Sequence, residues 1–120
     1  MIQQKRVYEP TERSDGCRIL VDRLWPRGLS RQRARIDEWM KELAPSTALR
    51  QWFGHDPEKW AEFQRRYKAE LRSQKPLLDR LTRLARRRRV TLVYGARDET
   101  HNDAVVLAGV VRRRLARPAR

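Results

Sequence analysis

The residues best suited to chemistry lie in two polar segments, each of which follows an apolar run. Asp22 and Arg23 directly follow Ile19-Leu20-Val21, and Asp98 lies in the polar loop that begins at Gly95. A carboxylate in such a position can act as a general base, and a guanidinium beside it can hold an anion. We therefore predict Asp22 and Asp98 as catalytic residues and Arg23 as an anion-binding residue. The alternative for Asp22 and Arg23 is a structural ion pair or a capped turn.

His55 is a third candidate for catalysis, because its imidazole precedes a carboxylic acid, Asp56. A histidine titrates near neutral pH, so the two side chains can form an acid/base dyad. The alternative is that Asp56 caps a helix that begins at Pro57. In that case His55 is a loop residue that packs near Trp52 or Phe53.

Other side chains in the same segments are suited to holding a ligand. In Trp25-Pro26-Arg27-Gly28, a flat ring can stack on a base while the guanidinium holds a phosphate. The alternatives are a rigid turn with a buried Trp25, a solvated His101 and helix capping by Asn102. The predicted ligand- and anion-binding set is Arg23, Trp25, Arg27, Arg97, His101 and Asn102.

A metal site would require both histidines, His55 and His101, to meet Asp22 or Asp98. Their spacing matches no ligand motif, so no metal is predicted. No cofactor is assigned. Cys17 is the only cysteine, which excludes an internal disulfide and a cysteine-rich zinc site.

Four segments are expected to form the sheet that positions these residues. Residues 3–8, 18–22 and 90–94 read as strands, and Val90 to Tyr94 is the clearest of them. Residues 36–43 are either a short further strand or a single helical turn before Pro45. Apolar runs of this kind suit strands that are covered on both faces.

Helices are expected between and after these strands. Ser46 is predicted to cap a helix that ends before Gly54, and Asp56 to cap the next one. Further helices are expected from Pro76 and over residues 104–115. The fold class is therefore α/β, with a small, mainly parallel sheet of about four strands and helices packed on it. In such sheets ligands bind outside the carboxyl ends of the strands.

The composition limits the classes of partner. The chain has 120 residues and a net charge of +14, from 29 Lys and Arg against 15 Asp and Glu. This excess favours anionic partners, with nucleic acid first, although an arginine-rich composition alone can produce it. We expect one domain over residues 1–116 and a frayed basic tail over 117–120. No apolar run approaches the ~18 residues of a membrane span, and the first residues lack an apolar signal core, so a cytoplasmic protein is expected.

Several of these motifs resemble the YeaO-like family, also known as domain of unknown function 488. The matching strings are Lys5-Arg6-Val7-Tyr8, Asp15 to Gly28, Lys41 to Ser46, Trp52 to Pro57, and Tyr94 to Asp98 with Asn102. The resemblance implies a small bacterial or archaeal cytoplasmic α/β protein and no settled activity. A remoter likeness is to the rhodanese and cysteine-phosphatase architecture. The loop from Gly95 to Asn102 stands where the anion cradle of that architecture would lie, but it contains no cysteine.

Three functions remain open at this point. The first is binding of, or action on, an anionic or phosphate-bearing ligand, such as a nucleotide, at the carboxyl ends of the strands. The second is a non-catalytic module that binds nucleic acid through its basic surface. The third is a small interaction protein. The sequence fixes neither an enzymatic activity nor an oligomeric state.

Overall fold

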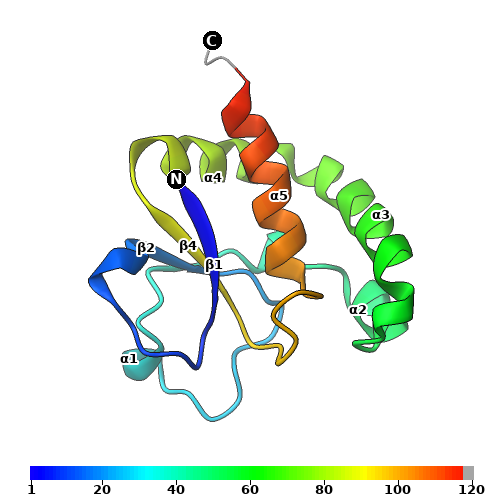
Figure 1. Ribbon diagram of the computed structural model, residues 1–120, viewed down its shortest axis with the longest axis horizontal. Helices are drawn as coiled ribbons and strands as arrows, with labels where there is room; N and C mark the ends of the chain where they lie inside the picture. Colours follow the sequence, from blue (N-terminus) through cyan, green and yellow to red (C-terminus); the bar gives the residue numbers. More distant parts are fainter. Residues whose placement is uncertain (118–120) are drawn as a thin grey trace.

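The fold is built on a four-stranded parallel sheet. A computed structural model describes residues 1–117 and gives the strand order β1-β4-β2-β3. The bounds are Ile2–Arg6 for β1, Cys17–Leu20 for β2, Glu38–Trp39 for β3 and Val90–Tyr94 for β4. All three strand pairs are parallel, and β4 pairs with both β1 and β2. The carboxyl ends of the strands therefore share one edge of the sheet, at the bottom of Figure 1. This confirms the predicted α/β class and the parallel sheet.

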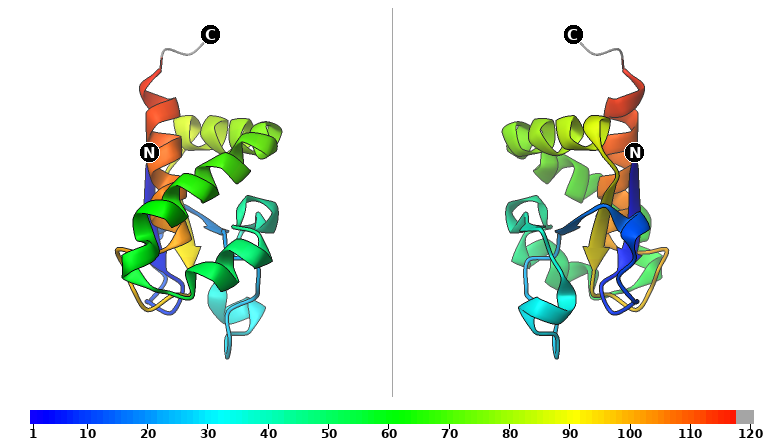
Figure 2. Two further views of the ribbon diagram at one scale, coloured as in Figure 1. Left: turned by 90° about the vertical axis from the view of Figure 1, so that its right-hand side faces the viewer. Right: turned by 90° about the vertical axis from the view of Figure 1, so that its left-hand side faces the viewer.

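Four helices cover one face of the sheet and enclose the main core. They are α2 (Thr47–Phe53), α3 (Trp60–Leu71), α4 (Lys75–Arg87) and α5 (Asp103–Ala116), seen edge-on in Figure 2. Ile19 and Leu92 point from the sheet into this core and are fully buried. The stripe of Phe63, Tyr67 and Leu71 on α3 packs against it, as the helical spacing of these residues predicts.

The opposite face of the sheet has a smaller cover. Leu20 and Val93 point to this side, because successive strand residues alternate between the two faces. They pack with Ala34 of the short helix α1 (Arg31–Ala34) and with Trp25 and Trp39. Both faces are thus buried, in agreement with the continuous apolar runs of β2 and β4.

The predicted helix starts are confirmed in detail. The Ser46 side chain accepts a hydrogen bond from the Leu49 amide, and Asp56 and Asn102 accept corresponding bonds from Glu58 and Val105. Asp56 begins the short 3-10 turn Pro57–Lys59, which leads directly into α3.

Residues 36–43 contain both of the expected alternatives in succession. The two-residue strand β3 is followed by a 3-10 turn over Lys41–Leu43. Two further 3-10 turns lie at Arg13–Asp15 and Arg72–Gln74. Of the expected basic tail, residues 118–120 lie outside the described residues. Over residues 1–117, no helix has the length and apolar character needed to cross a membrane.

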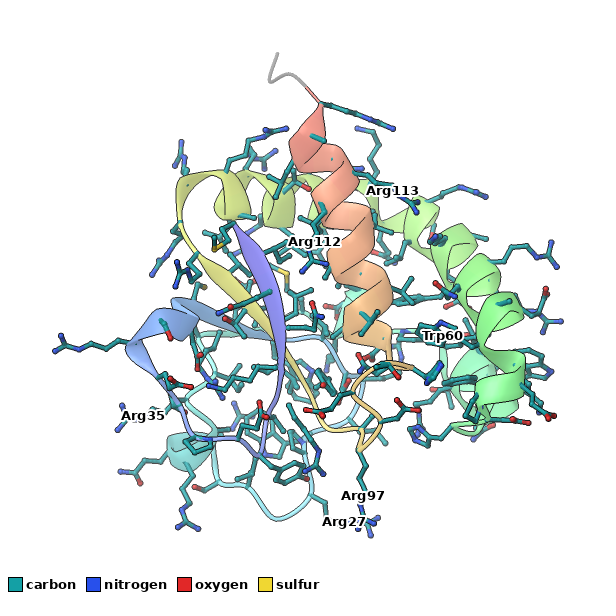
Figure 3. All side chains as sticks on the ribbon, in the orientation of Figure 1. Arg27, Arg35, Trp60, Arg97, Arg112 and Arg113 are labelled. Atoms are coloured by element: carbon teal, nitrogen blue, oxygen red, sulfur yellow. The ribbon has the colours of Figure 1, made fainter. Side chains whose placement is uncertain are left out.

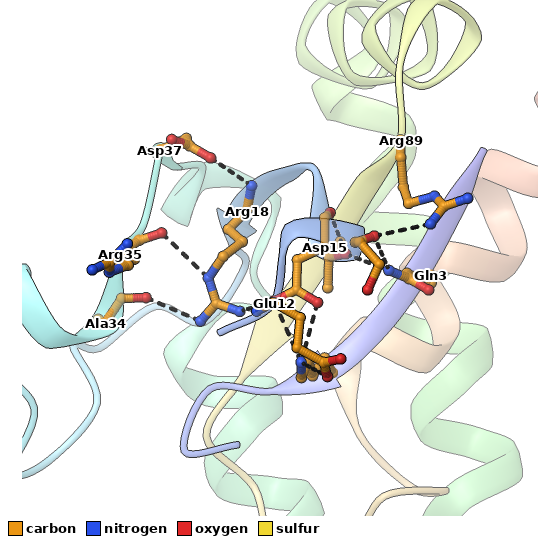
Figure 4. Close-up of polar contacts among 11 residues, drawn as sticks. Gln3, Glu12, Asp15, Arg18, Ala34, Arg35, Asp37 and Arg89 are labelled. Atoms are coloured by element: carbon orange, nitrogen blue, oxygen red, sulfur yellow. Dashed lines mark hydrogen bonds and ion pairs between the residues drawn. The ribbon is translucent and has the colours of Figure 1, made fainter. Parts of the chain in front are cut away.

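A buried arginine ties β2 to the connection that returns to β3. The Arg18 guanidinium is 2.7 Å from Asp15 Oδ2 and donates to the carbonyl oxygens of Ala34 and Arg35, while Asp37 accepts from the Arg18 amide (Figure 4). Both side chains of the Asp15–Arg18 pair are only 3% exposed. Each of the three guanidinium nitrogens of this buried charge therefore has a hydrogen-bond partner.

The surroundings of Asp15 favour its ionised form. Burial alone would raise its pKa, but hydrogen bonds from the Glu12 amide, Lys5 and Arg18 outweigh burial and lower the pKa. This carboxylate is thus neutralised by cations, in contrast to the acidic pair described below.

Replacement of Arg18 by Met is expected to destabilise the fold by about 3 to 5 kcal/mol, because it leaves the Asp15 carboxylate buried without its closest cation. Urea unfolding at neutral pH measures the loss. Arg33→Met, on the exposed surface of α1, is the matched control and should change stability by less than about 0.5 kcal/mol. Equal losses in the two variants would contradict this role of Arg18.

Candidate pocket at the carboxyl ends of the strands

A hollow of about 260 Å³ opens where β2 and β4 end. Its walls come from residues 22–27 after β2, from residues 95–96 and 101–103 between β4 and the first turn of α5, and from side chains of α2 and α3. This is the edge at which open parallel sheets bind ligands. Asp22, Arg23, Trp25, Arg27, His55, His101 and Asn102, all predicted from the sequence, line it.

Two carboxyl groups meet in the pocket. One oxygen of Asp22 accepts a hydrogen bond of 2.7 Å from the Gly95 amide, which joins the end of β2 to the end of β4. The Asp22 carboxyl also interacts with that of Asp103, the first residue of α5, and each group affects the pKa of the other. Two carboxyl groups can share a hydrogen bond only when one of them carries a proton. Asp22 and Asp103 therefore form an acidic dyad, in which a shared proton would supply the hydrogen bond.

The surroundings raise the pKa of both members of the dyad. Burial raises the pKa of both groups, and the negative charge of Asp22 raises the pKa of Asp103 well above its usual range. The pKa of Asp22 rises less, because the hydrogen bond from Asp103, the Gly95 amide and the charges of His55 and Arg50 favour its ionised form. With one proton on the pair, the dyad would offer one hydroxyl donor and several carboxylate acceptors.

Basic side chains line the exposed part of the pocket. Arg50 of α2 and His55 of the following turn both line the pocket and are exposed to solvent. His55 adopts the left-handed conformation, with φ of 57°, and its ring lies 6.2 Å from that of Phe53. Arg27 also lines the pocket, and Figure 3 shows it at the lower end of the molecule.

Two of the predicted ligand-binding residues are engaged in packing. Arg23 donates through Nε to the carbonyl oxygen of Pro45, 3.1 Å away, and through Nη2 to that of Ala44. The Trp25 indole donates to the Leu29 carbonyl oxygen, and its ring lies edge-on to Trp39 with centroids 5.6 Å apart. Both residues form fixed walls of the pocket.

Of the predicted residues in the loop after β4, Arg97 and Asp98 do not line the pocket. Asp98 Oδ1 accepts from the amides of Thr100 and His101, and Oδ2 lies 2.9 Å from the His101 ring. The Thr100 amide comes first among the bonds that lower the pKa of Asp98 to about 2. Within residues 1–117 the pocket lining omits both Arg97 and Asp98, and Figure 3 shows Arg97 directed away from the protein. Asp98 therefore shapes the loop.

His101 and Asn102 do reach the pocket wall. The His101 ring packs edge-on against Trp60 at 5.1 Å, and Asn102 caps α5 while donating to the Asp98 carbonyl oxygen. Neither residue is free of a structural partner, so each contributes to the wall and to the loop together.

Sequence reasoning missed Asp103 and Arg50. Asp103 follows the capping residue of a helix. An acidic side chain there ordinarily complements the helix dipole, so an aspartate in this position does not by itself indicate a functional site. Arg50 is one of many arginines. The signal that could have identified Asp103 is its place directly after Asn102, at the start of the helix that follows β4.

Among residues 1–117, no three His, Cys, Asp or Glu side chains are grouped in a way that could hold a metal ion. The pocket combines the Asp22–Asp103 dyad with partly apolar walls and basic side chains at its opening. Together with the parallel sheet, it defines a small α/β protein with a candidate ligand site at the carboxyl ends of its strands.

Comparison with known proteins gives the family of this chain. Residues 1–120 match a family model described as "Inactive DUF488-N3 subclade". The chain is 48% identical over 111 residues to "Uncharacterized protein YeaO" of Escherichia coli (strain K12), covering 92% of this chain and 96% of that protein. It is 41% identical over 107 residues to "Uncharacterized protein Rv3073c" of Mycobacterium tuberculosis (strain ATCC 25618 / H37Rv), covering 89% and 90%. No solved structure matches significantly. The chain belongs to the YeaO-like DUF488 family.

Replacement of Asp103 by Asn is expected to stabilise the protein increasingly as the pH rises. The raised pKa values mean that the folded state binds more protons than the unfolded state above pH ~4, so the dyad's contribution to stability is lost as pH rises toward the folded pKa. Asn keeps the donor and removes this loss. Urea unfolding of both proteins from pH 4.5 to pH 8 should show a widening difference, whereas a constant difference would contradict the shared proton.

Proposed function

We propose that the pocket binds a small ligand of nucleotide type, with a polar head on the acidic dyad and a phosphate or other anionic group at the opening. The observation that carries this proposal is the arrangement of ionisable groups: the Asp22–Asp103 dyad, whose pKa values are raised, lies within the pocket, and the basic side chains of Arg50 and His55 lie on its exposed part. An anion would be repelled by the dyad and attracted by the opening, so the ligand has only one favourable direction of entry.

The dyad selects the polar head. Asp103 supplies a hydroxyl donor and Asp22 supplies acceptor oxygens, one of which the Gly95 amide already occupies. The edge of a nucleobase, with an N–H beside an acceptor atom, matches this pair. Desolvated hydrogen bonds of this kind discriminate strongly, because a ligand that lacks the donor leaves a buried carboxylate unpaired.

The walls and the volume limit the body of the ligand. Phe53, Phe63 and Leu24 supply apolar surface along the pocket. Its volume of about 260 Å³ lies just below the range of about 300–1,000 Å³ for sites that hold drug-sized ligands. A base with its sugar fits this size, with the phosphate at the opening, and a dinucleotide cofactor does not.

Binding is favoured over turnover. The matched family model is described as "Inactive", and Asp98, one of the predicted catalytic carboxylates, supports a loop. Asp22 and His55 remain beside the pocket, but the proposal requires them only to hold charge and to orient the ligand.

The test is a titration of the ¹⁵N-labelled protein with AMP, GMP, CMP and UMP, with the corresponding nucleosides, and with inorganic phosphate, followed by amide NMR. At least one nucleotide should shift the amides of Gly95 and Asp103. Asp22→Asn should weaken that nucleotide by tenfold or more, which corresponds to about 1.4 kcal/mol.

Arg50→Gln separates the two ends of the ligand. It should weaken the nucleotide several-fold and leave the nucleoside unchanged, since only the nucleotide carries the phosphate. Arg13→Gln, which removes an exposed cation outside the pocket, is the matched control and should change neither. Absence of any shift at Gly95 and Asp103 at millimolar ligand, or equal losses in the control, would refute the proposed function.

A further inference from the structure

A second hollow, of about 420 Å³, lies away from the pocket, between α3, α4 and α5. The three helices meet in the upper part of Figure 1, where α4 passes behind α5, and Figure 3 labels Arg113, one of the residues that line the hollow, beside α5. We name it the basic groove. Its polar lining is entirely cationic within residues 1–117: Lys68, Arg72, Lys75, Arg113, Arg114 and Arg117.

One carboxylate, that of Asp79, holds two of these cations in place, and its single negative charge neutralises only one of the two positive charges. Asp79 on α4 pairs with Lys75, at 3.1 Å, and with Arg114 of α5. Arg114 also donates to Thr82 Oγ1, so its guanidinium is held at the wall of the groove. Two neighbouring helices are thereby joined, and the groove has a defined shape.

The other cations of the groove remain available to a partner. Lys68, Arg72 and Arg113 form no ion pair within residues 1–117, and Arg72 and Arg113 are exposed. Arg86, at the end of α4, donates to the carbonyl oxygens of Arg114 and Leu115 and adds a further charge beside the groove. Six basic side chains thus gather where three helices meet.

We propose that the basic groove binds the phosphate backbone of double-stranded nucleic acid. Arginine makes up most of its cationic lining, and a guanidinium can hold a phosphate through two parallel hydrogen bonds. No aromatic side chain lines the groove within residues 1–117, so it lacks the platforms on which single-stranded bases stack. The backbone of a duplex presents regularly spaced phosphates, which can pair with these cations. Unstacked bases would find no aromatic ring to stack on.

The groove has few apolar residues: Leu71, Leu78 and Val110. They do not form an exposed apolar patch that a membrane or a protein partner could cover. Leu71 and Leu78 are only 3% and 4% exposed, and they belong to the main core. This leaves charge as the attractive feature. The inference is independent of the pocket, because no residue lines both hollows within the described chain.

The experiment compares two doubly substituted proteins of equal net charge. Arg72→Gln/Arg113→Gln removes two exposed cations of the groove, and Arg13→Gln/Arg33→Gln removes two exposed cations elsewhere. Fluorescence anisotropy measures binding of each to a duplex DNA, a duplex RNA and the corresponding single strands from 50 to 200 mM salt. Circular dichroism checks that both variants are folded.

The wild-type protein should bind a duplex more tightly than its single strand. The groove variant should bind the duplex several-fold more weakly, with a log–log salt slope shallower by about 1.8 for two lost phosphate contacts. The control should stay within about twofold of wild type. Equal weakening of both variants, tighter binding of single strands, or binding of poly-glutamate or phosphatidylserine vesicles in place of duplexes would overturn the inference.

Discussion

The position of β4 between β1 and β2 is the constraint on which the site depends. Parallel pairing on both sides places the end of β4 beside the end of β2, so that the Gly95 amide reaches Asp22 at 2.7 Å. A side chain at Gly95 would approach the same carboxylate oxygen to 3.3 Å, which is tighter than ordinary contact. The chain then turns into α5 and brings Asp103 to this point. The dyad is therefore a consequence of strand order, although its members lie far apart in the sequence.

The protein neutralises its two acidic centres in opposite ways. Asp15 is surrounded by Lys5 and Arg18, which keep it ionised and make it part of the scaffold. Asp22 and Asp103 form no ion pair within residues 1–117, and burial raises the pKa of both. A pair of this second kind weakens the fold as the pH rises, whereas an apolar pair at the same place would not. This loss of folding stability occurs at an open pocket with basic side chains at its edge, and it is the physical reason for proposing that the pocket binds a ligand.

Local signals in the sequence were sufficient for the architecture. The apolar strands at Ile19 and Leu92 and the capping residues Ser46 and Asp56 act over a few neighbouring residues, and the structure contains them as predicted. Asn102, predicted to bind a ligand, has the alternative role of a helix cap and also lines the pocket. The edge that holds the pocket followed from the parallel sheet. The membership of the site depended on contacts over long distances in the chain. Asp98 folds back on its own loop and Asp103 turns toward Asp22, and residue type alone could not distinguish these outcomes.

The central claim is that Asp22 and Asp103 hold one proton between them at neutral pH. Carboxyl ¹³C NMR of aspartate-labelled protein, followed from pH 3 to pH 9, tests it most directly, with Asp22→Asn and Asp103→Asn used to assign the signals. The account predicts that one of the two carboxyl groups, assigned to Asp103, stays protonated at pH 7, far above the ordinary value of about 3.9. Titration of both groups near that ordinary value would contradict it.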